Sequence, residues 1–134
     1  YVVEGLGAVL IPIEVGDQLT IINDEGGQHC EIIACSPKGV TDAGIIGATA
    51  NGVAGGLKAL LTSDNQSLRG LRMGLDARGI DLSKAVALHL FEATTPAKTE
   101  ASFTAKRDGT VIISATGGAM DVGVMLAAKI IDLE

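Results

Sequence analysis

Short runs of β-branched and aliphatic residues, separated by turns that contain glycine, make up the first third of the chain. Three such runs occupy residues 8–14, 18–23 and 28–35. The turns between them contain Gly16 in the first case and the Gly26-Gly27 pair in the second. Strands at a spacing of roughly ten residues, joined by such turns, are typical of sandwiches and barrels. The pattern predicts three strands in an antiparallel meander.

The last third of the chain has the same character. Apolar residues alternate along 86–91, so that His89 falls on the face opposite Leu88. The segments 103–105 and 111–113 flank an Asp-Gly pair at 108–109, and this dipeptide favours a two-residue hairpin turn. We therefore expect these two segments to form a β-hairpin. The run 122–133 supplies a closing strand.

The middle of the chain changes to a helical spacing. Leu68, Leu71 and Leu75 recur at i, i+3 and i+7, which predicts a helix over 65–78 with one apolar stripe. Ser63 or Asp64 can cap its start, and Gly79 is a typical C-terminal stop. A shorter helix is expected over 57–61. Gly70 and Gly74, four residues apart in the longer helix, either weaken it or let another backbone approach closely.

These elements predict a mainly β (α+β) fold, an antiparallel β sandwich or barrel-like domain with one or two short helices in the middle. A chain of 134 residues without internal repeat or linker is expected to be one domain, 1–134. It opens on Tyr1 rather than methionine. We therefore expect it to be a fragment of a longer protein.

Composition and charge exclude several classes of function. The net charge is −6 and aromatic residues make up only 2% of the chain, so nucleic acid is not expected as a partner. No apolar run approaches the ~20 residues of a membrane span. The two cysteines are too few for a disulfide framework, which favours a reducing, cytoplasmic location.

The segment 28–35 gathers the reactive side chains His29, Cys30, Glu31 and Cys35. Because side chains in a strand alternate between faces, Cys30 and Cys35 are expected to point to opposite sides, and His29 and Glu31 to share one side. A zinc site needs three or four convergent ligands, which this arrangement does not supply. The sequence predicts buried structural cysteines and no metal site. His29 and Glu31 remain candidates for binding a small molecule.

Other motifs carry weaker signals. The glycine-rich stretch 52–58 lacks the Gly-Lys-Ser/Thr ending of a phosphate-binding loop, which favours an ordinary loop. His89 stands alone in an apolar strand, a place typical of a packed or half-exposed histidine. Asp121 either projects toward a ligand or caps a local element. We keep Glu31, His29 and Asp121 as candidate substrate-binding residues, with no catalytic residue assigned.

Several stretches nevertheless resemble a known family. The run VGDQLTIINDEGGQ at 15–28, with an acid three residues later, resembles an element of the urea-carboxylase-associated family. The motif GLRMG at 70–74, together with TTP at 94–96 and ASFTA at 101–105, is similar to the N-terminal region of trimethylamine N-oxide demethylase and related aminomethyltransferase-fused proteins. In the wider family a cysteine follows Ser-Ala and binds metal. Here Thr116 stands at that place, so the metal site is not carried over.

The resemblance implies a role in one-carbon metabolism. Enzymes of this group release formaldehyde from a methylated amine oxide and pass it to a folate-binding domain. Tetrahydrofolate and a metal would then be bound by other parts of the longer protein, and no cofactor by this domain. The chain would act as a non-catalytic or accessory domain, with other domains of the same protein and further copies of itself as partners. The alternatives are a stand-alone small-molecule-binding β module and a structural oligomerisation domain.

Overall fold

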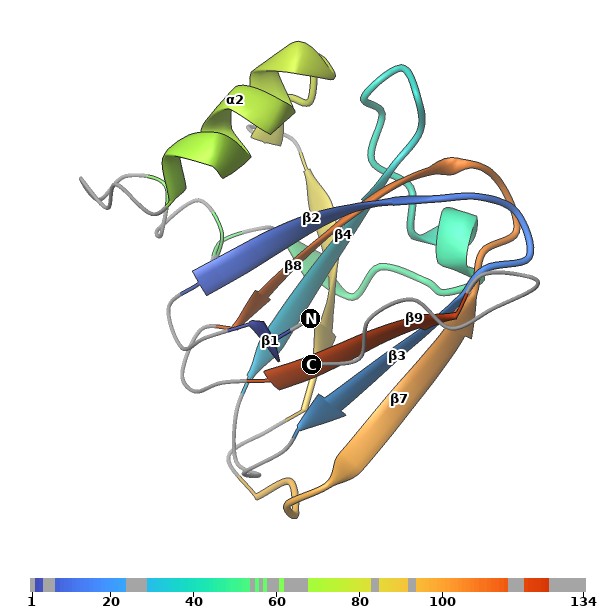
Figure 1. The fold of residues 1–134 in the computed structure, drawn as a ribbon, viewed down its shortest axis with the longest axis vertical. Helices are drawn as coiled ribbons and strands as arrows, with labels where there is room; N and C mark the ends of the chain where they lie inside the picture. The colour runs from blue at the N-terminus through green and yellow to red at the C-terminus, as the bar shows by residue number, and fades with distance from the viewer. Residues whose placement is uncertain are drawn as a thin grey trace.

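The described part of the chain forms two antiparallel sheets (Figure 1). A computed structural model describes residues 2–3, 7–23, 29–53, 55, 57, 61, 68–82, 85–91, 94–115 and 120–125. The four-stranded sheet has the order β1-β9-β3-β7 and contains β1 (Val2–Val3), β9 (Met120–Met125), β3 (Gln18–Asn23) and β7 (Thr99–Thr104). The five-stranded sheet has the order β2-β8-β4-β6-β5 and contains β2 (Gly7–Ile13), β8 (Gly109–Ala115), β4 (Cys30–Cys35), β6 (Val86–Leu90) and β5 (Gly52–Val53). The expected mainly β, antiparallel fold is confirmed, as an open sandwich.

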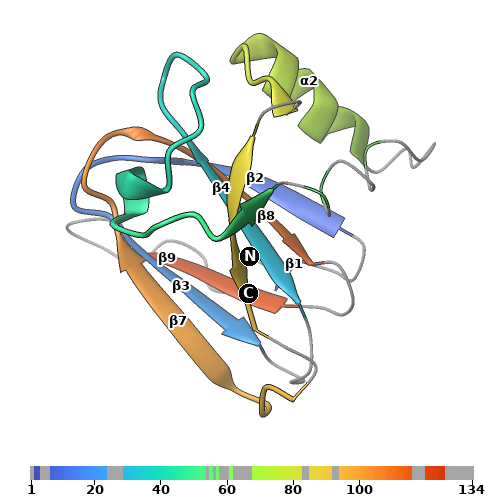
Figure 2. The ribbon, with the colours of Figure 1, turned by 180° about the vertical axis from the view of Figure 1, so that it is seen from behind.

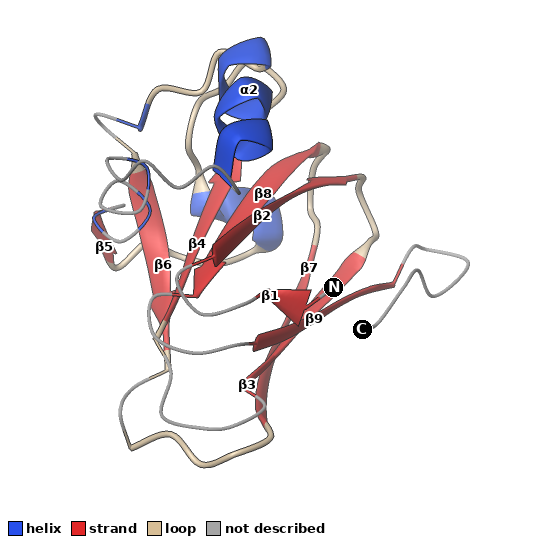
Figure 3. Cartoon of the chain, turned by 60° about the vertical axis from the view of Figure 1, so that its left-hand side comes forward, coloured by secondary structure: helices blue, strands red, loops and turns tan. Residues whose placement is uncertain are grey.

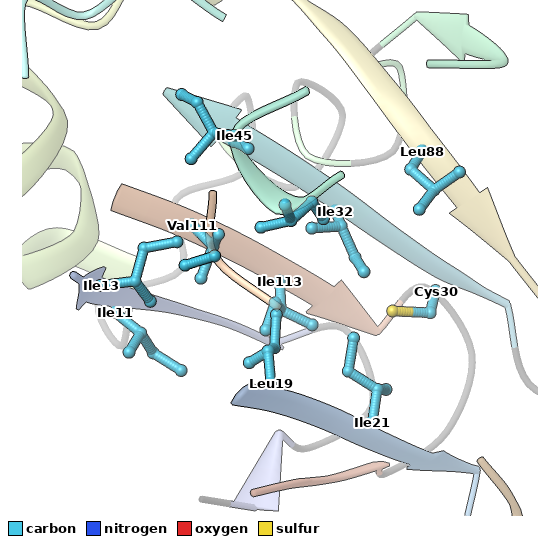
Figure 4. Packing of buried hydrophobic residues seen from close by; sticks show 13 residues of the cluster. Ile11, Ile13, Leu19, Ile21, Cys30, Ile32, Ile45, Leu88, Val111 and Ile113 are labelled. Atoms are coloured by element: carbon cyan, nitrogen blue, oxygen red, sulfur yellow. The ribbon is translucent and has the colours of Figure 1, made fainter. Parts of the chain in front are cut away.

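The main core lies between the two sheets and is aliphatic, as the scarcity of aromatic residues requires (Figure 4). Alternate residues of four strands enter it: Ile11, Ile13, Leu19, Ile21, Cys30, Ile32, Val111 and Ile113. Burial of branched aliphatic side chains contributes about 1.5–3 kcal/mol each to the free energy of folding. This layer is therefore the main source of stability.

A second core lies on the other face of the five-stranded sheet. The helix α2 (Arg69–Ala77) sits on the side of this sheet that faces away from the four-stranded sheet (Figures 1 and 2). Ile33, Cys35 and Ile112 point into this core from the sheet, and Leu71 and Leu75 from the helix. As a result, all six residues of β4 are buried.

Most predicted strands overlap observed ones, but β1 and β5 were not predicted, and of the predicted closing strand 122–133 only 122–125 lie in the described part, within β9. Two predicted pairings are wrong. The expected meander does not form, because β2 pairs with β8, β3 with β7 and β9, and β4 with β6 and β8. The expected hairpin at Asp108-Gly109 does not form either, since β7 and β8 belong to different sheets. The turn around Gly16, between β2 and β3, and the turn around Asp108, between β7 and β8, both lead from one sheet to the other. They hold each other in place, with Val15 N donating to Asp108 Oδ1 at 2.9 Å.

The predicted apolar stripe of the longer helix and its glycine stop are confirmed. The stripe of Leu68, Leu71 and Leu75 is buried, and Gly79 follows the helix with a φ of 66°. The proposed caps Ser63 and Asp64 lie outside the described residues. Within the predicted helix 57–61, residues 57 and 61 are helical and 58–60 lie outside the described part. No helix in the described ranges is long and apolar enough to cross a membrane.

A short 3-10 helix, η1 (Ala43–Ile46), was not predicted. It places Ile45 in the core between the sheets and begins at Asp42, whose side chain accepts from Gly44 N. Arg107 donates to Asp42 Oδ2 at 2.6 Å, and this bond lowers the pKa of the Asp42 carboxyl. Backbone contact is also made, with Lys106 N donating to Ile45 O at 2.7 Å. The glycine-rich middle of the chain thus closes one end of the sandwich.

Candidate functional site

A row of polar residues crosses the outer face of the five-stranded sheet. Glu31 on β4 stands opposite Ser114 on β8 and opposite His89 on β6 in the strand registers. Because residues directly opposite one another in antiparallel strands share a face, the three side chains lie on one side of the sheet. The residues next to them on that face, such as Ile33 and Ala87, belong to the apolar layer under α2.

Glu31 is the buried acid of this row, with 2% of its surface exposed. Its Oε1 accepts from Leu57 N at 3.1 Å, and its Oε2 lies 3.9 Å from Nδ1 of His89. The His89 side chain is 46% exposed, so the pair joins the interior to the surface. Ser114 Oγ donates to the backbone oxygen of Glu31 at 3.4 Å. A buried carboxylate costs free energy unless it is hydrogen-bonded, and the Leu57 amide supplies one such bond to the Glu31 carboxylate.

The chain around residue 51 is shaped to fit against His89. The Asn51 side chain bonds the His89 backbone twice, accepting from its N at 2.8 Å and donating to its O at 3.2 Å. Gly52 pairs with Ala87, and a Cβ at residue 52 would stand 2.6 Å from the His89 ring. Only glycine therefore allows the imidazole to lie against this strand. Figure 3 shows β5 beside β6 at this edge of the sheet.

The structure brings together a different pair from the one that strand alternation suggested. His29 is exposed and precedes β4, whereas the histidine opposite Glu31 is His89. Asp121 lies on β9, in the other sheet, paired with Ile22, and its side chain lies outside the described part. Substrate binding by Glu31, His29 and Asp121 stays a prediction. The Glu31–His89 contact depends on strand pairing across 58 positions, which a single sequence does not reveal.

The two cysteines behave as expected for structural residues. Cys30 points into the core between the sheets and Cys35 into the core under α2, so the predicted opposite orientation is confirmed. Burial, with a contribution from the charge of Glu31, raises the pKa of the Cys30 thiol to about 12, and burial raises that of Cys35 to about 11. Both thiols are therefore protonated near neutral pH, and a thiolate is the form that binds metal.

The donor set near β4 does not fit a metal. Among the residues that the structure describes, no group of three or more His, Cys, Asp or Glu side chains converges. In the glycine-rich stretch 52–58, which is only partly described, the Leu57 amide already donates to Glu31. That amide therefore serves the fold. The expected ordinary loop is wrong where the stretch is described, since Gly52 and Val53 form β5 and residues 55 and 57 are helical. Surface cavities of about 310–370 Å³ lie around α2 and the start of β8.

Most of this chain is similar in sequence to a short part of a known enzyme. No family model matches the chain. It is 60% identical over 121 residues to the trimethylamine-oxide aldolase of Ruegeria pomeroyi. The match covers 90% of this chain but only 15% of the length of that protein. This confirms the resemblance to trimethylamine N-oxide demethylase-like proteins, while the wider relation to the urea-carboxylase-associated family stays a prediction.

Proposed function

We propose that this chain is a non-catalytic, accessory domain of a one-carbon enzyme that resembles trimethylamine N-oxide demethylase. The observation that carries the proposal is the 60% identity to trimethylamine-oxide aldolase, together with the small share of that protein, 15%, that the match spans. Such a short part of a long enzyme serves as scaffold, as an oligomer contact or as one wall of a cavity. The catalytic groups then belong to the rest of the polypeptide.

The chemistry of the reaction supports this division. Trimethylamine N-oxide rearranges to dimethylamine and formaldehyde without any external oxidant, because the N–O bond is reduced as one methyl carbon is oxidised. Breaking the carbon–nitrogen bond requires an electrophilic centre or an acid–base group in a site shielded from water. The described residues offer two protonated thiols on opposite sides of a sheet and one acid–imidazole pair. A metal and tetrahydrofolate would be bound by the remaining domains.

The test is to divide the longer polypeptide. One version lacks the residues of this chain, and the purified 134-residue chain is added back to it. Formaldehyde and dimethylamine are measured with trimethylamine N-oxide as substrate. We expect the shortened enzyme to lose most of its activity and the added chain to restore part of it. An enzyme that is stable and fully active without the segment would show that the domain is dispensable.

The Glu31–His89 pair favours one second candidate, a small-molecule-binding role for the β fold. One oxygen of a buried carboxylate faces a half-exposed imidazole at 3.9 Å, which is an arrangement that can hold a cationic or hydrogen-bonding ligand. Calorimetric titration of the chain with trimethylamine N-oxide and dimethylamine tests this role. Binding that is abolished in Glu31→Gln, and retained in the control Lys38→Gln at an exposed position, would favour the binding module over the accessory role.

A further inference from the structure

A groove runs between α2 and the edge of the five-stranded sheet. Two adjoining cavities of about 330 and 370 Å³ form it, and both are lined by Arg78. The first lies between β2 and α2, and the second continues past the end of β2 to Asp108. We call the surface formed by Ala8, Leu10, Pro12, Gly70, Gly74 and Arg78 the α2–β2 groove.

The groove follows a strand edge that has no partner strand among the described residues. β2 ends the order β2-β8-β4-β6-β5. The smaller cavity touches both Val9 and Leu10, which point to opposite faces of the strand, so it opens along the edge itself. Proline lacks an N–H and within sheets occurs at edges, with its nitrogen turned away from the neighbouring strand. Pro12 in β2 fits this rule and leaves the carbonyls and the other amides of the edge available to a partner.

Two of the helix residues that line the groove, Gly70 and Gly74, have no side chain. A Cβ on Gly70 would have nothing within 4 Å, and one on Gly74 would be 3.4 Å from Leu10 Cδ1. Glycine inside a helix costs about 1 kcal/mol relative to alanine. At Gly70 no described atom of this chain uses the space gained. The space beside Gly70 is therefore open to something that packs against the helix.

We propose that the α2–β2 groove is the surface on which another part of the same longer polypeptide docks. This inference rests on the proposed function. The related aldolase has about 85% of its length outside the matched segment, so most of the polypeptide is available as a partner. The floor of the groove is apolar at Ala8, Leu10 and Leu71, with Arg78 between its two halves. An apolar segment whose backbone approaches at Gly70 matches the first half of this lining, and a polar residue matches the second half, where Arg78 lies with Glu14 and Asp108.

Photo-cross-linking in the intact longer polypeptide tests the proposal. Benzoylphenylalanine replaces Arg78 in the groove or, as a control, Asp76, which is exposed two residues away and lines a cavity on the other side of α2. Irradiated protein is digested and the cross-linked peptides are identified by mass spectrometry. We expect position 78 to form links to peptides outside residues 1–134 of the same polypeptide, and position 76 to form far fewer.

A filling variant gives an independent measurement. Gly70→Leu places a side chain in open space, so the segment itself should fold, but the docked partner must move. Overpacking of a tight contact is expected to weaken docking about tenfold or more, seen as faster proteolysis between this segment and the next domain. Asp76→Leu adds the same side chain on the other side and should leave the rate unchanged.

The outcomes separate this inference from the proposed function. Links from position 78 only within the segment or to a second copy, or equal proteolysis of the two leucine variants, overturn the docking surface alone. If the enzyme needs the segment for activity while the links from position 78 stay within the segment or join a second copy, the proposed accessory role stands and only the docking surface is wrong. A reading frame that encodes no further domain overturns the proposed function as well.

Discussion

The two sheets of this domain meet the same core but differ on their outer faces. In β4, at the centre of the five-stranded sheet, all six residues are buried, because α2 and the segment around Leu57 cover the outer face. In β3 of the four-stranded sheet, burial alternates strictly, and Ile22 is only partly covered while Ile21 is fully buried. A strand covered on both faces is mostly apolar, and Glu31 is the exception in β4, whereas a strand covered on one face alternates.

The two outer faces also differ in how their polar side chains are placed. On the open face of the four-stranded sheet, Thr20 and Ser102 bond each other at 3.1 Å in contact with water. On the covered face of the five-stranded sheet, Glu31 is held by Leu57 N and faces His89. A buried carboxylate is costly, so this face is where a functional group, if the domain has one, is expected.

The largest change in unfolding free energy is expected for neighbouring isoleucines in the two sheets. Ile112 and Ile113 in β8 are both buried, on opposite faces, so either change to alanine should cost about 2–5 kcal/mol of unfolding free energy. In β3, Ile21→Ala should cost a similar amount and Ile22→Ala clearly less. Urea unfolding of the purified variants measures all four. Equal costs for Ile21 and Ile22 would contradict the one-sided covering of the four-stranded sheet.

The same difference explains what the sequence could and could not predict. The runs 8–14 and 18–23 were found as stretches of β-branched and aliphatic residues between glycine turns, and the leucine stripe of α2 because burial on one helix face leaves a period in the sequence. The pairing of strands leaves no such local record. Gly16 and Asp108 mark turns in the sequence, but nothing local states that each turn leads to the other sheet. Likewise His89 looks like an isolated residue until β6 is placed beside β4.

A smaller effect is expected at Gly109, the first residue of β8. A Cβ there would stand 2.4 Å from the Cys35 backbone oxygen, inside the five-stranded sheet. Gly109→Ala should destabilise the protein by about 1–3 kcal/mol through overpacking. Gly70→Ala is the matched control, since a Cβ there meets nothing, and it should stabilise the isolated chain by up to about 1 kcal/mol. Melting temperatures that move in the same direction would contradict this account of Gly109.

Each core holds one buried thiol, Cys30 or Cys35, and both thiols make the stability of the fold depend on pH. The folded pKa values of about 12 for Cys30 and about 11 for Cys35 lie above the ordinary value of 9.0. Unfolded thiols therefore lose protons first, and stability that is fully present below pH 9 falls as pH rises toward 11–12. Cys30→Ala and Cys35→Ala should each flatten this alkaline loss by similar amounts below pH 10.5, because both folded pKa values lie above that pH. Urea midpoints from pH 8 to 10.5 measure it, and no flattening in either variant would show that other groups cause the loss.

The smallest effect belongs to the open face. Ser102→Ala removes the hydroxyl contact with Thr20, and cross-strand pairs of this kind contribute about 0.2–1 kcal/mol. We expect a change near the lower end, because water replaces the lost bond. A double-mutant cycle with Thr20→Val isolates the pair. A coupling energy above about 2 kcal/mol would mean that this face is covered in solution.

In the proposed role, this domain serves an enzyme without performing its chemistry. The most direct measurement incubates the purified 134-residue chain with trimethylamine N-oxide, with and without added iron or zinc, and assays formaldehyde. We expect no formaldehyde above the protein-free control under any of these conditions. Turnover that survives extensive purification, and that disappears in Glu31→Gln or Asp121→Asn, would place an active site in this chain and contradict the accessory role.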